Sequence, residues 1–91
     1  MEVLVRLEYI DNPEEVVAAE RAMAADLRRD GKLVRMWRDP CQKANWTLWN
    51  VADADELHRI FAALPMFPYF GKREVHILAE HPVDPKTPHA I

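Results

Sequence analysis

The sequence has few of the residues on which common metal and phosphate sites depend. Its single cysteine, Cys41, cannot form an internal disulfide, and no local motif marks it as a nucleophile. Its two glycines, Gly31 and Gly71, lie too far apart to form a glycine-rich phosphate loop. The four histidines show neither an HxH nor an HExxH spacing. These absences argue against a metal site and against nucleotide binding through a phosphate loop.

Long apolar runs and clusters of basic residues are also missing. No segment is long and apolar enough to span a bilayer, and charged residues interrupt the first ten positions, unlike the core of a signal peptide. The chain has 12 Lys and Arg against 15 Asp and Glu, and the basic residues are spread along it. We therefore expect a cytoplasmic protein that contacts neither membrane nor nucleic acid.

The apolar residues that are present predict six elements. Strands are expected where apolar residues alternate, and helices where they recur every three or four positions. Asp11 and Asn12 supply capping oxygens for a first helix, Pro13 suits its first turn, and Gly31 suits its end. A second helix is expected to begin at a capping box formed by Asp53 and Glu56 and to end before Pro65. The other predicted ranges are strands over 3–10, 32–38, 44–51 and 73–79 and a first helix over about 14–29.

The order β-α-β-β-α-β predicts a ferredoxin-like α+β fold, with a four-stranded antiparallel sheet and two helices on one face. Residues 1–80 are expected to form this single domain, and residues 81–91, which contain three prolines, an extended tail. A chain of 91 residues builds only a modest core. Because both sheet faces carry apolar residues, we expect the uncovered face to be buried by oligomerisation.

The connection between the second helix and the last strand is unusually apolar. Pro65 and Pro68 stiffen it, and Met66, Phe67 and Phe70 give it more apolar surface than a solvated loop carries. Such a segment either plugs the end of a core or lines a pocket.

Glu20 is the most informative single residue. On a helical wheel it falls about 40° from Val16, on the apolar face that also includes Met23. Two interpretations stay open from the residues alone. Either the carboxylate reaches water or pairs with Arg6 or Arg38, or it is a partly desolvated general base with a raised pKa.

Five short motifs follow one another along the chain: Trp37-Arg38, Ala44-Asn45, Glu56-Leu57-His58, Leu64-Pro65-Met66-Phe67-Pro68-Tyr69, and Leu78 with His81-Pro82. In content and spacing they resemble the muconolactone isomerase family. The resemblance implies a small ferredoxin-like enzyme that assembles into a homo-oligomeric ring, typically a decamer. It also implies that no metal or organic cofactor is needed, and that the protein acts in bacterial breakdown of aromatic compounds through catechol and 3-oxoadipate.

The chemistry implied by this resemblance is allylic proton transfer in a five-membered unsaturated lactone. Glu20 falls on the glutamate that the family carries in its first helix, which implies that it shuttles the proton. The intermediate dienolate needs hydrogen-bond donors at its carbonyl oxygen. The candidate substrate-binding residues are Arg38 for the substrate carboxylate or for orienting Glu20, Asn45, Trp46 and Tyr69 as donors, and Phe67 to exclude water.

Departures from the family pattern leave the substrate open. Val17 stands where the family usually carries a lysine, and the turn from Cys41 to Lys43 differs from the family's turn. Lys43 is therefore a candidate to replace the missing cation at the substrate. The connection 70–73 is also about one residue longer than usual. The alternatives are a lactone dehalogenase, another reaction on a related small molecule, or a non-catalytic oligomer that binds small molecules.

Overall fold

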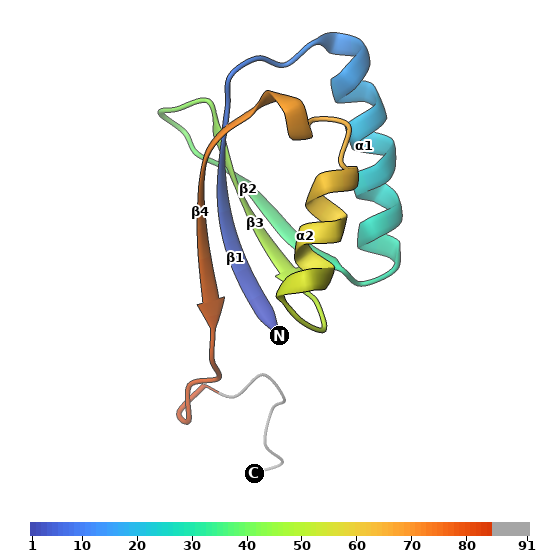
Figure 1. Cartoon of the computed structure of the whole chain (residues 1–91). Coiled ribbons are helices and arrows are strands. Elements are labelled where there is room, and N and C mark those ends of the chain that lie inside the picture. The colour runs from blue at the N-terminus through green and yellow to red at the C-terminus, as the bar shows by residue number, and fades with distance from the viewer. Residues whose placement is uncertain (85–91) are drawn as a thin grey trace.

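The computed structural model describes residues 1–84, and its elements follow the predicted order (Figure 1). The strands form one antiparallel sheet in the order β2-β3-β1-β4, and both helices cover the same face of it. The predicted ferredoxin-like fold is therefore confirmed. The elements are β1 (Glu2–Tyr9), α1 (Glu14–Arg29), β2 (Leu33–Arg38), β3 (Ala44–Asn50), α2 (Ala54–Ala63), the short 3₁₀ helix η1 (Phe67–Tyr69) and β4 (Phe70–Leu78).

Helix α1 has the predicted limits, but it begins without the predicted side-chain cap. Pro13 occupies the cap position, and no side chain bonds the first free N–H groups of the helix. The Asp11 carboxylate instead accepts a hydrogen bond from the N–H of Asn12 at 2.8 Å. Capping by Asp11 or Asn12 is thus wrong, because Asp11 serves the turn before the helix. At the other end Gly31 adopts φ +77°, the left-handed conformation predicted for it.

Helix α2 begins as the sequence predicts. Asp53 Oδ1 accepts a hydrogen bond from the N–H of Glu56 at 2.8 Å. Glu56 Oε1 reaches back one residue further than in a standard capping box, and it accepts from the N–H of Ala52 and from Lys32 Nζ, both at 3.0 Å. Both bonds lower the pKa of Glu56, and the bond from Lys32 has the larger effect. The cap therefore also ties the start of β2 to the start of α2.

The core lies between the helices and the sheet. The ring of Trp49 on β3 meets that of Phe61 on α2 edge-on, with centroids 5.1 Å apart. Met66 and Phe70 are buried at the end of this core. The apolar connection between α2 and β4 therefore closes the end of the core, which is one of the two roles predicted for it. The other buried members of the core are Val3, Val5, Leu7, Leu33, Val51, Leu57 and Leu64.

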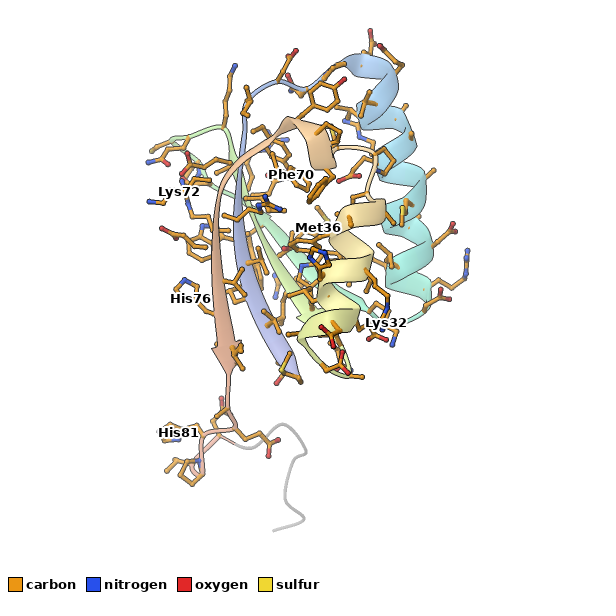
Figure 2. All side chains as sticks on the ribbon, viewed as in Figure 1. Lys32, Met36, Phe70, Lys72, His76 and His81 are labelled. Carbon is orange, nitrogen blue, oxygen red and sulfur yellow. The ribbon has the colours of Figure 1, made fainter. Side chains whose placement is uncertain are left out.

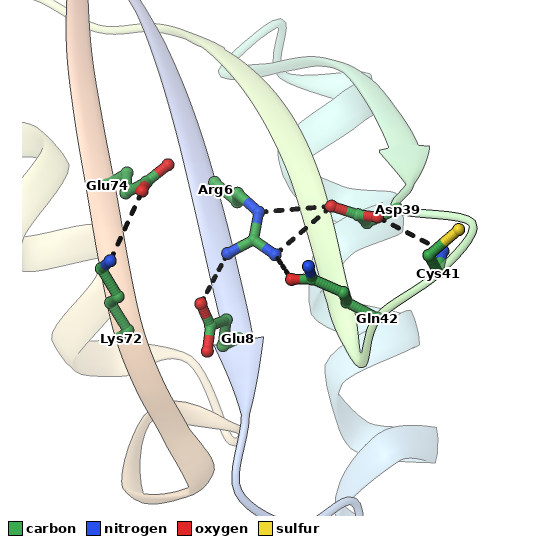
Figure 3. A network of polar contacts seen from close by, with 7 residues as sticks. All are labelled: Arg6, Glu8, Asp39, Cys41, Gln42, Lys72 and Glu74. Atoms are coloured by element: carbon green, nitrogen blue, oxygen red, sulfur yellow. Dashed lines mark hydrogen bonds and ion pairs between the residues drawn. The ribbon is translucent and has the colours of Figure 1, made fainter.

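The opposite face of the sheet carries no helix in the described part of the chain. Arg6 on β1 is buried there, where it pairs with Glu8 at 2.6 Å and with Asp39 at 3.3 Å and donates to Gln42 (Figure 3). Asp39 and Gln42 belong to the turn between β2 and β3, so Arg6 holds that turn against β1. The side chain of His76 also points away from the helices (Figure 2).

Strand β4 begins at Phe70, three residues before the predicted start at Arg73. Leu7 of β1 pairs with Arg73, but Tyr9 pairs with Phe70, so β4 contains one additional residue at this point. Gly71 and the neighbouring charged residues hid this part of the strand from a pattern of alternation. His81 and Asp84 form an isolated bridge, and the predicted tail beyond residue 84 lies outside the described residues. No helix within residues 1–84 is long and apolar enough to cross a membrane.

Candidate active site

A cavity of about 590 Å³ lies between α1 and the sheet. Its walls are one face of α1, helix-facing residues of β1, β2 and β3, and the turn that precedes β3. No side chain of α1 is fully buried, so this helix leaves space between itself and the sheet. Side chains able to take part in chemistry converge on this space, among them Tyr9, Glu20, Arg38, Gln42, Lys43 and Asn45.

Glu20 lines the cavity from α1 and is about half-buried. Its Oε1 accepts a hydrogen bond from the backbone N–H of Met66 at 3.3 Å. Burial raises the pKa of this carboxyl above its ordinary value, and the Met66 N–H offsets only part of that effect. Glu20 forms no ion pair within residues 1–84, and Arg6 lies on the other face of the sheet. An ion pair with Arg6 is therefore excluded, and Glu20 has the surroundings of a partly desolvated base.

Tyr9 joins the site from the end of β1, although the sequence analysis did not single it out. Asn45 Nδ2 donates a hydrogen bond to the Tyr9 hydroxyl oxygen at 2.7 Å. Burial raises the pKa of Tyr9, the bond from Asn45 lowers it, and the charge of Glu20 raises it further. The alternation of β1 could have revealed this residue, because Val5, Leu7 and Tyr9 all face the helices.

Four cationic side chains line the cavity, and two of them, Arg21 and Arg28, belong to α1. Arg38 ends β2 and Lys43 precedes β3, and both are exposed. Neither forms an ion pair with any residue in the part of the chain that the structure describes. Val17, which replaces the lysine expected from the family, lines the same cavity from α1. Lys43 is thus placed where it can supply a positive charge to the cavity.

Three of the predicted substrate-binding residues are not brought into the cavity lining. Trp46 faces away from the helices and stacks on His76, with ring centroids 6.4 Å apart. This follows from the alternation of β3, since Asn45 faces the helices and the next residue must face away. Phe67 and Tyr69 pack against the core from η1 without reaching the cavity. The structure therefore gathers Glu20 with Arg38, Lys43 and Asn45, and leaves Trp46, Phe67 and Tyr69 elsewhere.

The chemistry available in this cavity is acid–base chemistry on a small anion. Among the described residues, no three His, Cys, Asp or Glu side chains gather closely enough to hold a metal ion. Cys41 is exposed in the turn and does not line the cavity. What remains is a half-buried carboxylate, a hydroxyl–amide pair and cationic side chains that form no ion pair within residues 1–84, a set suited to moving a proton within a negatively charged substrate.

Comparison with known sequences finds close relatives. The family model of muconolactone delta-isomerase matches residues 6–84. The muconolactone delta-isomerase of Rhodococcus opacus is 40% identical over 73 residues, which cover 80% of this chain and 77% of the relative. That of Cupriavidus pinatubonensis is 38% identical over 69 residues, which cover 76% and 74%.

Comparison with solved structures agrees. A crystal structure of muconolactone isomerase superposes with a TM-score of 0.81 at 26% identity, covering 100% of this chain and 98% of the other. A 5-chloro-2-hydroxyhydroquinone dehydrochlorinase from Burkholderia phenoliruptrix superposes with a TM-score of 0.63 and covers 92% and 99%. At 14% identity, this second likeness shows a shared fold alone.

Proposed function

Because the chain belongs to the muconolactone delta-isomerase family and is an isomerase, we propose that Glu20 moves a proton within a five-membered unsaturated lactone. The match to the family model and the identity to its members confirm the family that the sequence motifs predicted. The observation that carries the proposal is the Glu20 carboxylate, which is half-buried in the cavity and, within residues 1–84, is bonded only to one backbone N–H. The proposal includes the route predicted from the sequence, in which the enzyme acts in the breakdown of aromatic compounds through catechol and 3-oxoadipate.

The reaction needs one group that first accepts and then returns a proton. The Glu20 carboxylate takes the γ proton of the lactone, and the negative charge spreads from that carbon to the carbonyl oxygen as a dienolate. The resulting carboxylic acid then gives the same proton to the α carbon, so the double bond moves and the composition is unchanged. A raised pKa makes Glu20 a stronger base than an ordinary glutamate and suits both steps.

Arg38 and Lys43 are the proposed contacts for the substrate carboxylate. Both line the cavity and lack a partner of opposite charge among residues 1–84, so their charge is available to an anion. Asn45 contributes a polar side chain at the floor of the cavity. Substrate binding also remains predicted for three residues that do not line the cavity of a single chain, and their positions do not support that role: Trp46, Phe67 and Tyr69.

The test is the ultraviolet absorbance change on mixing the purified protein with muconolactone. We expect the native chain to turn it over and Glu20→Gln to lower kcat by roughly 10²–10⁴. Glu15→Gln is the matched control, because Glu15 is an exposed carboxylate on the same helix outside the cavity. We expect kcat/KM of the native chain to rise with pH through the raised pKa of Glu20.

Two outcomes would contradict the proposal. Full activity of Glu20→Gln would remove Glu20 as the proton shuttle. Absence of turnover by the native chain would reject muconolactone as substrate, and a panel of substituted and chlorinated lactones with chloride detection would then separate isomerisation from dehalogenation.

We further propose a cytoplasmic homo-oligomer, with the decameric ring that the resemblance implies. The support is apolar surface left on both edge strands of the sheet, where Trp37 of β2 is 39% exposed and Val75 and Ile77 of β4 are 54% and 67% exposed. Sedimentation equilibrium of the full chain tests this assembly, and a monomer at micromolar concentration would reject it.

A further inference from the structure

The hydroxyl of Tyr9 is held as an acceptor, which leaves its own proton free. Asn45 Nδ2 donates to the Tyr9 oxygen at 2.7 Å, so the hydroxyl proton must point in another direction. Within residues 1–84, no group accepts a hydrogen bond from that hydroxyl. Tyr9, Asn45 and Glu20 all line the same cavity. The geometry thus presents a donor to whatever occupies the space beside the proposed base.

Tyr9 is fixed at three points along its length. Its backbone N–H donates to the carbonyl oxygen of Lys43 at 2.9 Å. Its ring packs against Phe70 with centroids 5.7 Å apart, at the point where the additional residue of β4 brings Phe70 opposite Tyr9. Asn45 then fixes the hydroxyl itself. A donor held in this way needs little rearrangement when charge develops in front of it.

We propose that the Tyr9 hydroxyl donates a hydrogen bond to the lactone carbonyl oxygen as the dienolate forms, and that Asn45 is the positioning residue that aims it. This inference rests on the proposed function, because the charge that Tyr9 stabilises is created when Glu20 removes the γ proton. Tyr9 keeps its proton throughout, so no covalent bond to Tyr9 is made or broken. It would bind the dienolate more tightly than the lactone and so lower the barrier.

The charge of Glu20 makes this donor respond to the reaction. Burial and the negative charge of Glu20 both raise the pKa of Tyr9, which keeps the hydroxyl protonated before the reaction. When Glu20 takes up the substrate proton it becomes neutral, and the negative charge appears on the carbonyl oxygen instead. The effect of Glu20 on Tyr9 is then lost, so the hydroxyl becomes a better donor in the intermediate.

The experiment compares steady-state kinetics of the native chain, Tyr9→Phe, and a chain with 3-fluorotyrosine at position 9. Tyr9→Phe keeps the ring on Phe70 and removes only the hydroxyl. We expect kcat to fall by about 10²–10³ with KM changed by less than about threefold, since the donor acts mainly on the dienolate. The fluorinated residue retains the hydroxyl, and we expect it to restore most of the activity. A merely structural role would lower the thermal midpoint of Tyr9→Phe and would not confine the loss to kcat.

Several results would overturn the inference. Tyr9→Phe with kcat within about threefold of native would remove Tyr9 as the donor, and so would a change in KM alone. A larger loss for Tyr69→Phe than for Tyr9→Phe would transfer the role to the tyrosine named from the sequence. Glu20→Gln distinguishes this failure from failure of the proposed function. If Glu20→Gln is inactive while Tyr9→Phe is fully active, only the inference fails, and a native chain without turnover overturns both.

Discussion

The indole N–H of Trp49 donates a hydrogen bond to Oγ1 of Thr47, two residues earlier on the same strand, at 2.7 Å. The Thr47 hydroxyl in turn donates to the carbonyl oxygen of Val5 at 3.2 Å. All three residues are buried. This chain of two bonds satisfies the polar atom of the Trp49 side chain and adds a side-chain link between β3 and β1.

Thr47→Val should therefore destabilise the protein although valine has nearly the same shape. The substitution leaves the Trp49 N–H buried without an acceptor, and we expect the free energy of unfolding to fall by about 1–3 kcal/mol. Urea denaturation followed by tryptophan fluorescence measures it. Thr47→Ser keeps the hydroxyl and is the matched control, with a smaller loss. Equal stability of the native chain and Thr47→Val would show that the hydroxyl chain contributes nothing.

Asp53→Ala tests the start of α2. It removes the oxygen that accepts from the N–H of Glu56, and we expect a loss of about 1 kcal/mol, as for other helix caps. In a domain of this size, that corresponds to a thermal midpoint lower by roughly 4–8 °C. Asp55→Ala is the control, because Asp55 lies in the first turn but does not cap it. A similar loss in both variants would assign the effect to first-turn charge and not to the cap.

Glu20 should make the stability of the native chain depend on pH. Its pKa is raised in the folded state, so the folded chain binds more protons than the unfolded chain between the two pKa values. Stability is therefore unaffected below the unfolded pKa and falls as pH rises through the folded pKa. We expect Glu20→Gln to raise the thermal midpoint relative to native at about pH 8, and to do so less at about pH 4. A difference that is the same at both pH values would contradict this.

Arg38→Gln and Lys43→Gln should weaken substrate binding. If these cations contact the substrate carboxylate, each loss of a charge-assisted hydrogen bond raises KM by about tenfold or more. Lys72→Gln is the control, because Lys72 is exposed on β4, outside the cavity, and pairs with Glu74. A fall in kcat with unchanged KM would instead mean that the cation orients Glu20. A lactone without a carboxylate should be insensitive to all three substitutions.

Most of the fold could be predicted because local signals agreed with one another. The alternation of Val3, Val5 and Leu7 indicated the strand β1, and Gly31 marked the end of α1. Alternation also separated Asn45 from Trp46, but it could not tell which of the two faces the helices would cover. Which face the helices cover depends on the packing of distant segments, so the sequence left both Asn45 and Trp46 as candidates for the site.

The parts that could not be predicted depend on tertiary structure. Tyr9 resembles any other strand residue until Asn45, 36 positions later, is brought against its hydroxyl. The additional residue of β4 is visible only through its pairing with β1. Asp11 was a reasonable helix cap by residue type, but Pro13 already directs the chain into the helix and leaves Asp11 to the turn.

Helix α1, which fully buries none of its side chains, separates two tasks within a small protein. The residues that hold the chain together lie mainly on the strands and on α2, whereas Val17 and Glu20 on α1 face the cavity. Val17 packs against the edge of the core and is only partly buried, so substitutions at Val17 and Glu20 change the size and charge of the space offered to a ligand while they remove little buried surface from the core. A lineage can therefore exchange one small substrate for another through this helix while its folding remains intact.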